Sequence, residues 1–139
     1  MRISLRHDFF AKQKYIFFWA ICDNMENGGD IFKVTVNVPE EFLERIMDSV
    51  NSVMGPVYPG YDRTFSYSPV TGTWRPLEGS SPYKGTIGKI EVSDEIRLEF
   101  VVKRNDLRKV IDAIEKIHPY EEPAIDVTKV LCRKEIHSL

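Results

Sequence analysis

A strand pattern followed by a helix pattern occurs twice in this sequence, 64 residues apart and in the same phase. Apolar and polar residues alternate from Phe32 to Val38 and again from Ile96 to Val102, which is the period of a strand with one buried face. Each strand pattern leads into an apolar stripe at helical spacing, so the chain is restricted to a sheet with a helix after each of two strands. The matched pairs at this offset are Val38 and Val102, Leu43 and Leu107, Met47 and Ile111, Val50 and Ile114, and Val53 and Ile117.

The ends of both helices carry residues that favour a boundary. Pro39 suits the first turn of the first helix, and Gly55 is expected to end it as a C-terminal cap. Asn105 is a favourable N-cap for the second helix. Pro119 disfavours helical backbone at the residue before it, so the second helix is predicted to stop near His118.

An extended stretch follows each helix, at residues 64–77 and 124–131. Two successive strand–helix–strand units predict an α+β fold, the ferredoxin-like βαβ-βαβ sandwich, with both helices on one face of an antiparallel sheet. Ser66–Trp74 is interpreted as a hairpin that turns near Gly72, within an elaborated arm. Residues 55–88 hold six of the eight glycines and are rich in aromatic residues, which is too apolar for a disordered linker.

The first thirty residues differ from the rest of the chain. We therefore divide the sequence into an N-terminal extension of uncertain role, residues 1–30, and a single domain, residues 31–139. The run Tyr15–Cys22 is apolar, but eight residues rise only about 12 Å as a helix, against about 30 Å of hydrocarbon in a bilayer. Basic residues precede this run, yet no small-residue cleavage site follows Ala20, which argues against a secretory signal.

Composition excludes several classes of protein. The formal charge of −2 and a pI near 5.9 lack the positive field that drives non-specific phosphate binding, so no nucleic-acid partner is expected. No membrane partner is expected either, because no apolar run is long enough to span one. Cys22 and Cys132 form no CxxC pair, which favours a reduced, cytoplasmic protein over a disulfide-stabilised one.

The densest polar cluster is the segment His118-Pro-Tyr-Glu-Glu-Pro123. One interpretation is that His118, Glu121 and Glu122 contribute ligands to a divalent metal ion, the candidate cofactor. The other is a rigid exit turn, in which the prolines set the backbone and Tyr120 packs. One histidine and two acids fall short of a complete ligand set, so a metal site would need residues from a neighbouring subunit.

A second cluster joins the segment 60–63 to the segment 73–80. Arg75 is suited to bidentate contact with a carboxylate or phosphate, and Asp62 to orienting it. An ion pair that holds the arm to the core is the structural alternative. No nucleophile motif or phosphate-binding glycine pattern is complete, so no catalytic residue is assigned. The candidates for ligand binding or for an interface are Tyr61, Asp62, Trp74, Arg75, Glu78 and Tyr120.

Residues 31–131 resemble the small domain inserted in Nif-three-like proteins of the YqfO type, and the stand-alone versions of that domain most of all. The likeness rests on Gly60-Tyr-Asp62, Ser66–Gly72, Trp74–Ser80, Pro82, Gly85-x-x-Gly88, Glu99 and His118–Asp126. The inserted domain is similar in fold to CutA and PII proteins, which typically form trimers, and CutA chains carry a similar His-Pro-Tyr-Glu turn. The resemblance implies a homo-oligomer, with a trimer favoured.

Three functions are compatible with these observations. The leading hypothesis is a non-catalytic, oligomeric binding or assembly module, with a small ligand or a divalent metal as its candidate ligand. The first rival is a metal-dependent hydrolase resembling GTP cyclohydrolase, but the histidine-rich ligands of the long Nif-three-like proteins belong to a flanking domain that this sequence lacks. The second rival is metal-ion tolerance or sensing, implied only by the CutA-like turn.

Overall fold

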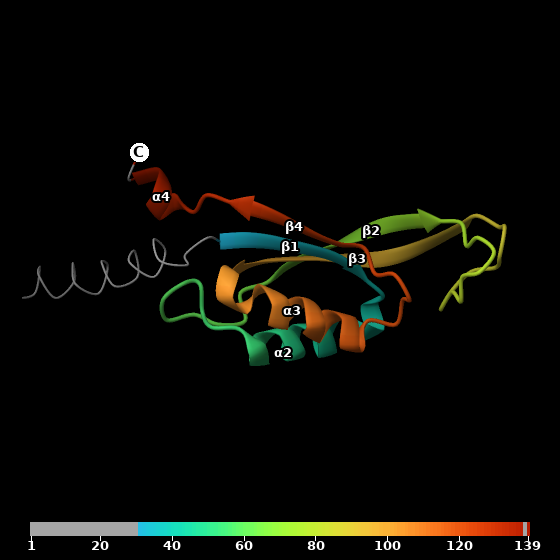
Figure 1. The fold of residues 1–139 in the computed structure, drawn as a ribbon, viewed down its shortest axis with the longest axis horizontal. Coiled ribbons are helices and arrows are strands. Elements are labelled where there is room, and N and C mark those ends of the chain that lie inside the picture. The colour runs from blue at the N-terminus through green and yellow to red at the C-terminus, as the bar shows by residue number, and fades with distance from the viewer. Residues whose placement is uncertain (1–30, 138) are drawn as a thin grey trace, which may run out of the picture.

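The computed structural model describes residues 31–137 and 139; the predicted extension 1–30 lies outside this range. Four antiparallel strands form one sheet in the order β2-β3-β1-β4, and the helices α2 and α3 lie side by side on one of its faces (Figure 1). The elements are β1 Ile31–Val38, η1 Glu40–Phe42, α2 Leu43–Val53, β2 Ser66–Trp74, β3 Glu91–Lys103, α3 Arg104–Ile117, β4 Ile125–Val130 and α4 Arg133–His137. The predicted ferredoxin-like α+β sandwich is confirmed.

The two strands of the repeated unit are neighbours in the sheet. β1 pairs with β3 in antiparallel register, from Ile31 opposite Lys103 to Val38 opposite Ile96. β4 pairs with the other edge of β1, where Val34 lies opposite Val127. Because alternate residues of a strand share a face, this register places the apolar positions of all three strands toward the helices.

The core lies between the sheet and the two helices. The apolar stripes of α2 and α3 face the apolar positions of β1 and β3, as the period of each stripe predicts. Full burial of one valine, leucine, isoleucine, methionine or phenylalanine side chain stabilises a fold by about 1.5–3 kcal/mol. The fully or nearly fully buried members are Val34, Val36, Val38, Leu43, Ile46, Met47, Val50, Leu98, Phe100, Val102, Val110 and Ile114.

The prediction of a hairpin within Ser66–Trp74 is wrong. These residues form one continuous strand, β2, which pairs with β3 from Ser66 opposite Glu99 to Trp74 opposite Glu91. Gly72 lies inside the strand opposite Ser93, and its backbone does not adopt a positive φ. The chain reverses instead through the longer loop 75–90. The glycine that suggested a turn is needed for close packing, as described below.

Two helix boundaries also differ from expectation. α2 ends at Val53 with extended backbone at Met54, so Gly55 is not its left-handed cap. α3 begins at Arg104, one residue before the predicted N-cap Asn105, and no side chain caps its first turn. The end of α3 at Ile117, immediately before His118, is as predicted.

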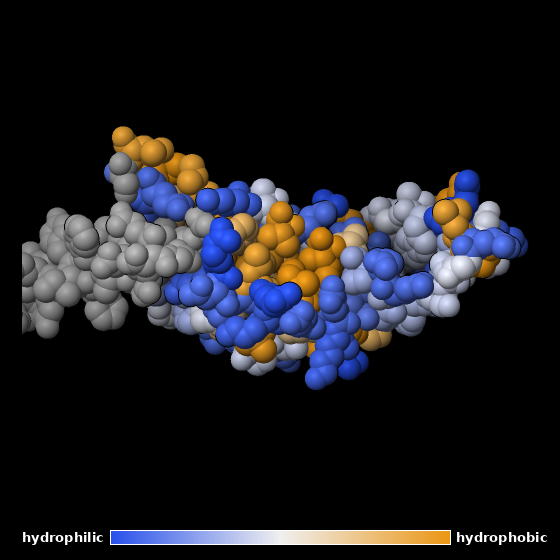
Figure 2. All heavy atoms as spheres, viewed as in Figure 1, coloured by the Kyte–Doolittle hydropathy of each residue, from blue (hydrophilic) through white to orange (hydrophobic). Residues whose placement is uncertain are grey.

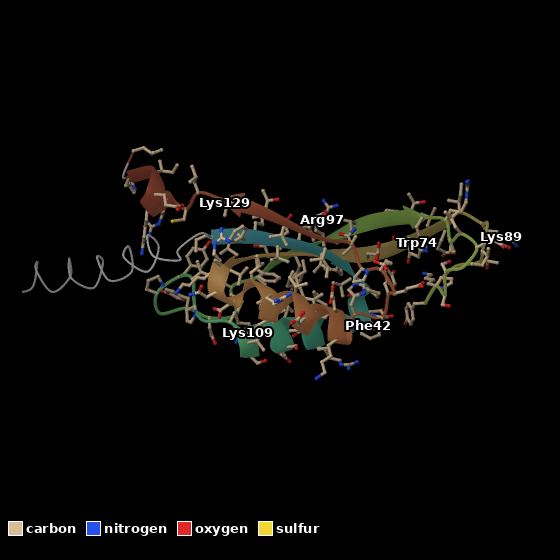
Figure 3. All side chains as sticks on the ribbon, viewed as in Figure 1. Phe42, Trp74, Lys89, Arg97, Lys109 and Lys129 are labelled. Atoms are coloured by element: carbon tan, nitrogen blue, oxygen red, sulfur yellow. The ribbon has the colours of Figure 1, made fainter. Side chains whose placement is uncertain are left out.

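β2 and β3 extend past the other two strands as a two-stranded arm. β1 pairs with β3 only as far as Ile96, so Glu91–Glu95 pair with β2 alone. The sheet face away from the helices is polar and carries charges of both signs, including Arg97, which Figure 3 shows on that side. Within residues 31–137, no helix has the length and apolar character needed to cross a bilayer.

Candidate binding site

The turn after α3 fixes His118 against the end of β1. The His118 imidazole is buried; its Nε2 lies 2.8 Å from the carbonyl oxygen of Asn37, and its Nδ1 accepts the backbone N–H of Tyr120 at 3.1 Å. A neutral imidazole has one donor and one acceptor nitrogen, so Nε2 is the donor to Asn37. Burial lowers the pKa of His118, although the Asn37 carbonyl and the Glu95 carboxylate act in the opposite direction. His118 is therefore held neutral as a structural connection.

Beside this turn, the side chain of Glu95 on β3 is buried and lies against Gly72 of β2. The Tyr120 hydroxyl donates a hydrogen bond to the Glu95 carboxyl group, whereas Glu95 Oε2 has no hydrogen-bond partner within the described residues. Burial raises the pKa of Tyr120, and the hydrogen bond and the charge of Glu95 raise it further. A buried polar atom without a partner costs free energy, which makes Glu95 the most unusual polar group of the described fold.

Tyr120 is the centre of an aromatic cluster, which we define as Phe42, Trp74, Tyr83, His118 and Tyr120. The Tyr120 ring centroid lies 4.9 Å from that of His118, 5.6 Å from Trp74 and 5.9 Å from Tyr83. Tyr83 in turn meets Phe42 edge to face at 6.2 Å. Such ring pairs each stabilise by about 0.5–1.5 kcal/mol beyond the area they bury. The cluster joins the start of α2, the end of α3 and the arm.

Polar contacts hold the loop 75–90 to the same place. The Trp74 indole N–H donates to the carbonyl oxygen of Lys84 at 3.1 Å, and Figure 3 shows Trp74 where β2 approaches this loop. The Lys84 ammonium donates to Ser93 Oγ at 2.7 Å. The backbone N–H of Ser81 donates to Glu121 Oε2 at 2.9 Å. These contacts hold the loop 75–90 and the end of the arm against the turn after α3.

The residues proposed as metal ligands do not form a site within one chain. Both nitrogens of His118 are engaged, and Glu121 accepts the backbone of Ser81. Among residues 31–137 and 139, no three His, Cys, Asp or Glu side chains are placed to hold a metal ion. The donor set of His118, Glu121 and Glu122 does not fit a metal here, and a site shared between subunits stays a prediction.

The second predicted cluster is divided between two ends of the sheet. Asp62 accepts a hydrogen bond from the Asn51 side chain at 3.1 Å, beside the end of α2, and the neighbouring Tyr61 is exposed. Trp74 and Arg75 lie at the far end of β2, whose nine residues span about 27 Å. Exposed Glu78 lies with them in the loop 75–90. The structure therefore brings Trp74 to Tyr120, but does not bring Asp62 to Arg75.

An open groove of about 480 Å³ lies between α3 and β4. Its apolar side chains come from both elements, and its acidic side chains come from the end of α3 and from the following turn. Figure 2 shows a hydrophobic patch at this position, bordered by hydrophilic residues. The lining residues are Ile111, Glu115, Tyr120, Glu121, Glu122, Pro123, Ile125 and Val127.

Comparisons with known proteins agree with this geometry. No family model matches the chain. A Staphylococcus epidermidis protein named GTP cyclohydrolase 1 type 2 homolog is 36% identical over 104 residues, which are 75% of this chain. The Bacillus subtilis protein of the same name is 34% identical over 98 residues, or 70% of this chain. A solved Bacillus cereus structure, described as a protein related to NIF3, superposes on 73% of this chain with 32% identity and a TM-score of 0.63.

The chain belongs to the Nif-three-like family. It spans about a quarter of the length of these relatives, 28% of the S. epidermidis protein and 26% of the B. subtilis and B. cereus proteins. More distant structures show the fold alone. CutA from Archaeoglobus fulgidus matches 73% of the chain with a TM-score of 0.55 and 17% identity, and it is covered to 85% of its own length. The B. subtilis GlnK–ATP complex gives a TM-score of 0.52 at 16% identity, with the same two coverages.

Sequence reasoning missed three polar residues of this Nif-three-like chain's site, Lys84, Ser93 and Glu95. The predicted strand began at Ile96, so Ser93 and Glu95 were left outside it. The local pattern gave no signal for the two strand residues: Ser93 and Glu95, opposite Gly72 and Val70 of β2, alternate in phase with exposed Arg97 and out of phase with buried Leu98. Two polar residues at successive positions on one face of a strand predict that this face is exposed to solvent. Their burial follows from the loop 75–90 folding over the arm.

Proposed function

We propose that this chain is a non-catalytic binding and assembly module that self-associates through its β2–β3 arm. The observation that carries the proposal is the arm itself, a two-stranded ribbon with exposed apolar side chains. Val92 on the arm is 62% exposed, and Ile90 and Leu77 in the loop 75–90 at its end are 63% and 67% exposed. An isolated two-stranded ribbon is marginally stable, and apolar patches of this kind mark interaction surfaces. A second copy of this chain is the partner that we propose, because identical subunits can bury the same apolar surface against one another.

The open edges of the sheet support the same proposal. Among the described residues β2 and β4 are the edge strands of the sheet, and an edge strand is a template for pairing with another chain. The sheet face away from the helices carries both signs of charge, with Arg97 and Glu99 on β3 and Lys33 on β1. Complementary charges set the register between copies more than they add affinity. We expect three copies, the number implied by the resemblance to CutA and PII proteins.

Of the interface candidates from the sequence, Trp74, Arg75 and Glu78 lie at the end of the arm, where a neighbouring copy would meet them. Tyr120 contributes indirectly, because it packs on Trp74 and holds the arm in place. Tyr61 and Asp62 lie at the other end of β2 and have no part in this proposal. The polar groups of the turn are engaged in backbone contacts, which favours a binding role over catalysis.

Light scattering after size exclusion tests the assembly. We expect an oligomer at micromolar concentration, and a lower mass for the double variant Ile90→Lys with Val92→Lys. Lys116→Glu, an exposed change on α3 away from the arm, is the matched control and should keep the wild-type mass. A monomeric wild-type protein at these concentrations contradicts the proposal.

Two further measurements separate the module from its enzymatic and metal-binding rivals. We expect no turnover of GTP and no rise of the melting temperature with zinc, manganese or copper. A ligand that binds the native state raises its stability with concentration, by RT ln(1 + [L]/Kd). A concentration-dependent rise that His118→Ala abolishes would favour a shared metal site, and turnover by metal-free protein would contradict the non-catalytic role.

A further inference from the structure

The groove between α3 and β4 combines an apolar floor with an acidic rim. Ile111, Ile125 and Val127 supply the floor, and Val127, on the edge strand β4, is 42% exposed. Glu115, Glu121 and Glu122 supply the rim, and none of them is buried. At about 480 Å³ the groove is within the ~300–1,000 Å³ range of pockets that bury most of a drug-sized molecule. It is suited to a partner that is apolar and carries positive charge.

The sequence contains a segment of that chemistry. Tyr15–Cys22 is the longest apolar run of the chain and contains four aromatic residues. Lys12 and Lys14 come directly before it, and the first fourteen residues hold four basic side chains against the single acid Asp8. The charge of this segment is therefore complementary to the acidic rim of the groove.

The connection is long enough for the run to reach the groove of its own molecule. Ile31, where β1 begins, pairs with Val130 at the end of β4, so the chain enters the fold beside the strand that walls the groove. Val127 lies opposite Val34, which is three residues from Ile31 along β1, a distance of about 10 Å. The eight residues 23–30 span up to about 26 Å when extended. A tether of this length gives a millimolar effective concentration, which favours the same molecule over a second copy.

We propose that residues 15–22 of this chain dock in the groove between α3 and β4 of the same molecule, with the basic residues that precede them against the acidic rim. The apolar contact removes the floor of the groove from water. The charge pairs select this groove over other apolar surfaces and weaken with salt, because the rim is exposed.

Disulfide trapping in the full-length chain tests the placement. Cys22 ends the apolar run, so a cysteine at position 127 with Cys132→Ser leaves one pair able to cross-link. We expect Val127→Cys to form an intramolecular disulfide under mild oxidation, seen as a faster-migrating monomer on a non-reducing gel. Thr128→Cys is the matched control, because its side chain lies on the opposite face of β4. Equal yields at the two positions, or a product of dimer mass, overturn the proposal.

Fluorescence gives a second readout that needs no engineered cysteine. The chain has two tryptophans, so Trp74→Phe leaves Trp19 inside the apolar run as the only reporter. We expect Trp19 to resist acrylamide quenching, and Glu115→Lys with Glu122→Lys to raise the quenching constant at least twofold. Asp112→Lys, an exposed acid of α3 outside the groove, should leave it unchanged. If Trp19 is fully accessible in buffer and protected only on adding phosphatidylserine vesicles, the run binds membranes and the proposal is wrong.

Discussion

The Glu95 side chain lies across Gly72 on the neighbouring strand, where a Cβ would collide with its Oε1. The ring edge of Trp74 flanks the same position. Gly72 is therefore a strand residue whose missing side chain makes room for a buried carboxyl group. This contact lets Glu95 reach Tyr120 and so connects the arm to the turn after α3.

We expect Gly72→Ala to destabilise the protein by about 1–3 kcal/mol, because the new methyl group displaces the carboxyl group of a buried residue, Glu95. Urea unfolding measures the loss. Thr71→Ala, an exposed change on the adjacent position, should stay within about 0.5 kcal/mol of wild type. In a Glu95→Ala background most of the Gly72→Ala penalty should disappear; a penalty that persists there would mean that the collision is not its cause.

Tyr120→Phe removes the hydroxyl group that donates to Glu95 and leaves the rings in place. The carboxyl group then loses a donor in a buried position, so we expect a loss of about 1–3 kcal/mol in the free energy of unfolding. Tyr67→Phe removes an exposed hydroxyl from β2 and is the control. Equal stabilities of the two variants would show that the hydrogen bond between Tyr120 and Glu95 adds nothing to the fold.

Most of the fold was predictable because its elements are amphipathic. The alternation from Phe32 to Val38 and the stripes of α2 and α3 each report which side faces the core, and the repeat at 64 residues fixes their order. These patterns, in a chain too short for two sheets, also predict that β1 and β3 lie in the same sheet. Local patterns of this kind were sufficient to predict the sheet, the two helices and the end of α3.

The arm and the site were not predictable in the same way. A glycine within a polar stretch indicates a turn, yet Gly72 is explained only by a side chain 23 residues away. Gly55 similarly looked like a helix cap, but its N–H donates to Asp106 at the start of the other helix. The candidates at the turn were found because His118 and Tyr120 stand in a proline-bounded motif, whereas Glu95 has no local signal.

Acid should destabilise the protein through His118. Its pKa is lowered in the folded state, so the unfolded chain takes up the proton first. The stabilising effect is present above the ordinary value of about 6.5 and is lost as the pH falls through it toward the folded pKa. We expect the unfolding free energy to fall between pH 8 and pH 5.5, and less steeply in His118→Gln. His137→Gln, which changes an exposed histidine, should keep the wild-type slope; if His118→Gln keeps it too, the imidazole is not the group responsible.

A second pH dependence lies at lower pH, where Asp106 joins the end of α2 to the first turn of α3. Its carboxylate accepts the Gly55 N–H at 3.0 Å and pairs with the Lys109 ammonium at 3.2 Å. Burial alone would raise the pKa of Asp106, but these contacts outweigh it and hold the pKa below its ordinary value.

The folded carboxyl group therefore stays charged at a pH at which the unfolded one is protonated. Its contribution is present above about pH 4 and is lost as the pH falls toward the folded pKa. We expect Asp106→Asn to cost about 1 kcal/mol at pH 6, since the amide oxygen still accepts the Gly55 N–H but no longer pairs with Lys109 or favours the helix N-terminus. Urea unfolding at pH 6 and pH 3 measures the difference, which should shrink at pH 3. Asp112→Asn, an exposed change in the same helix, is the control, and a cost that is equal at both pH values would show that the charge of Asp106 is not what stabilises the junction.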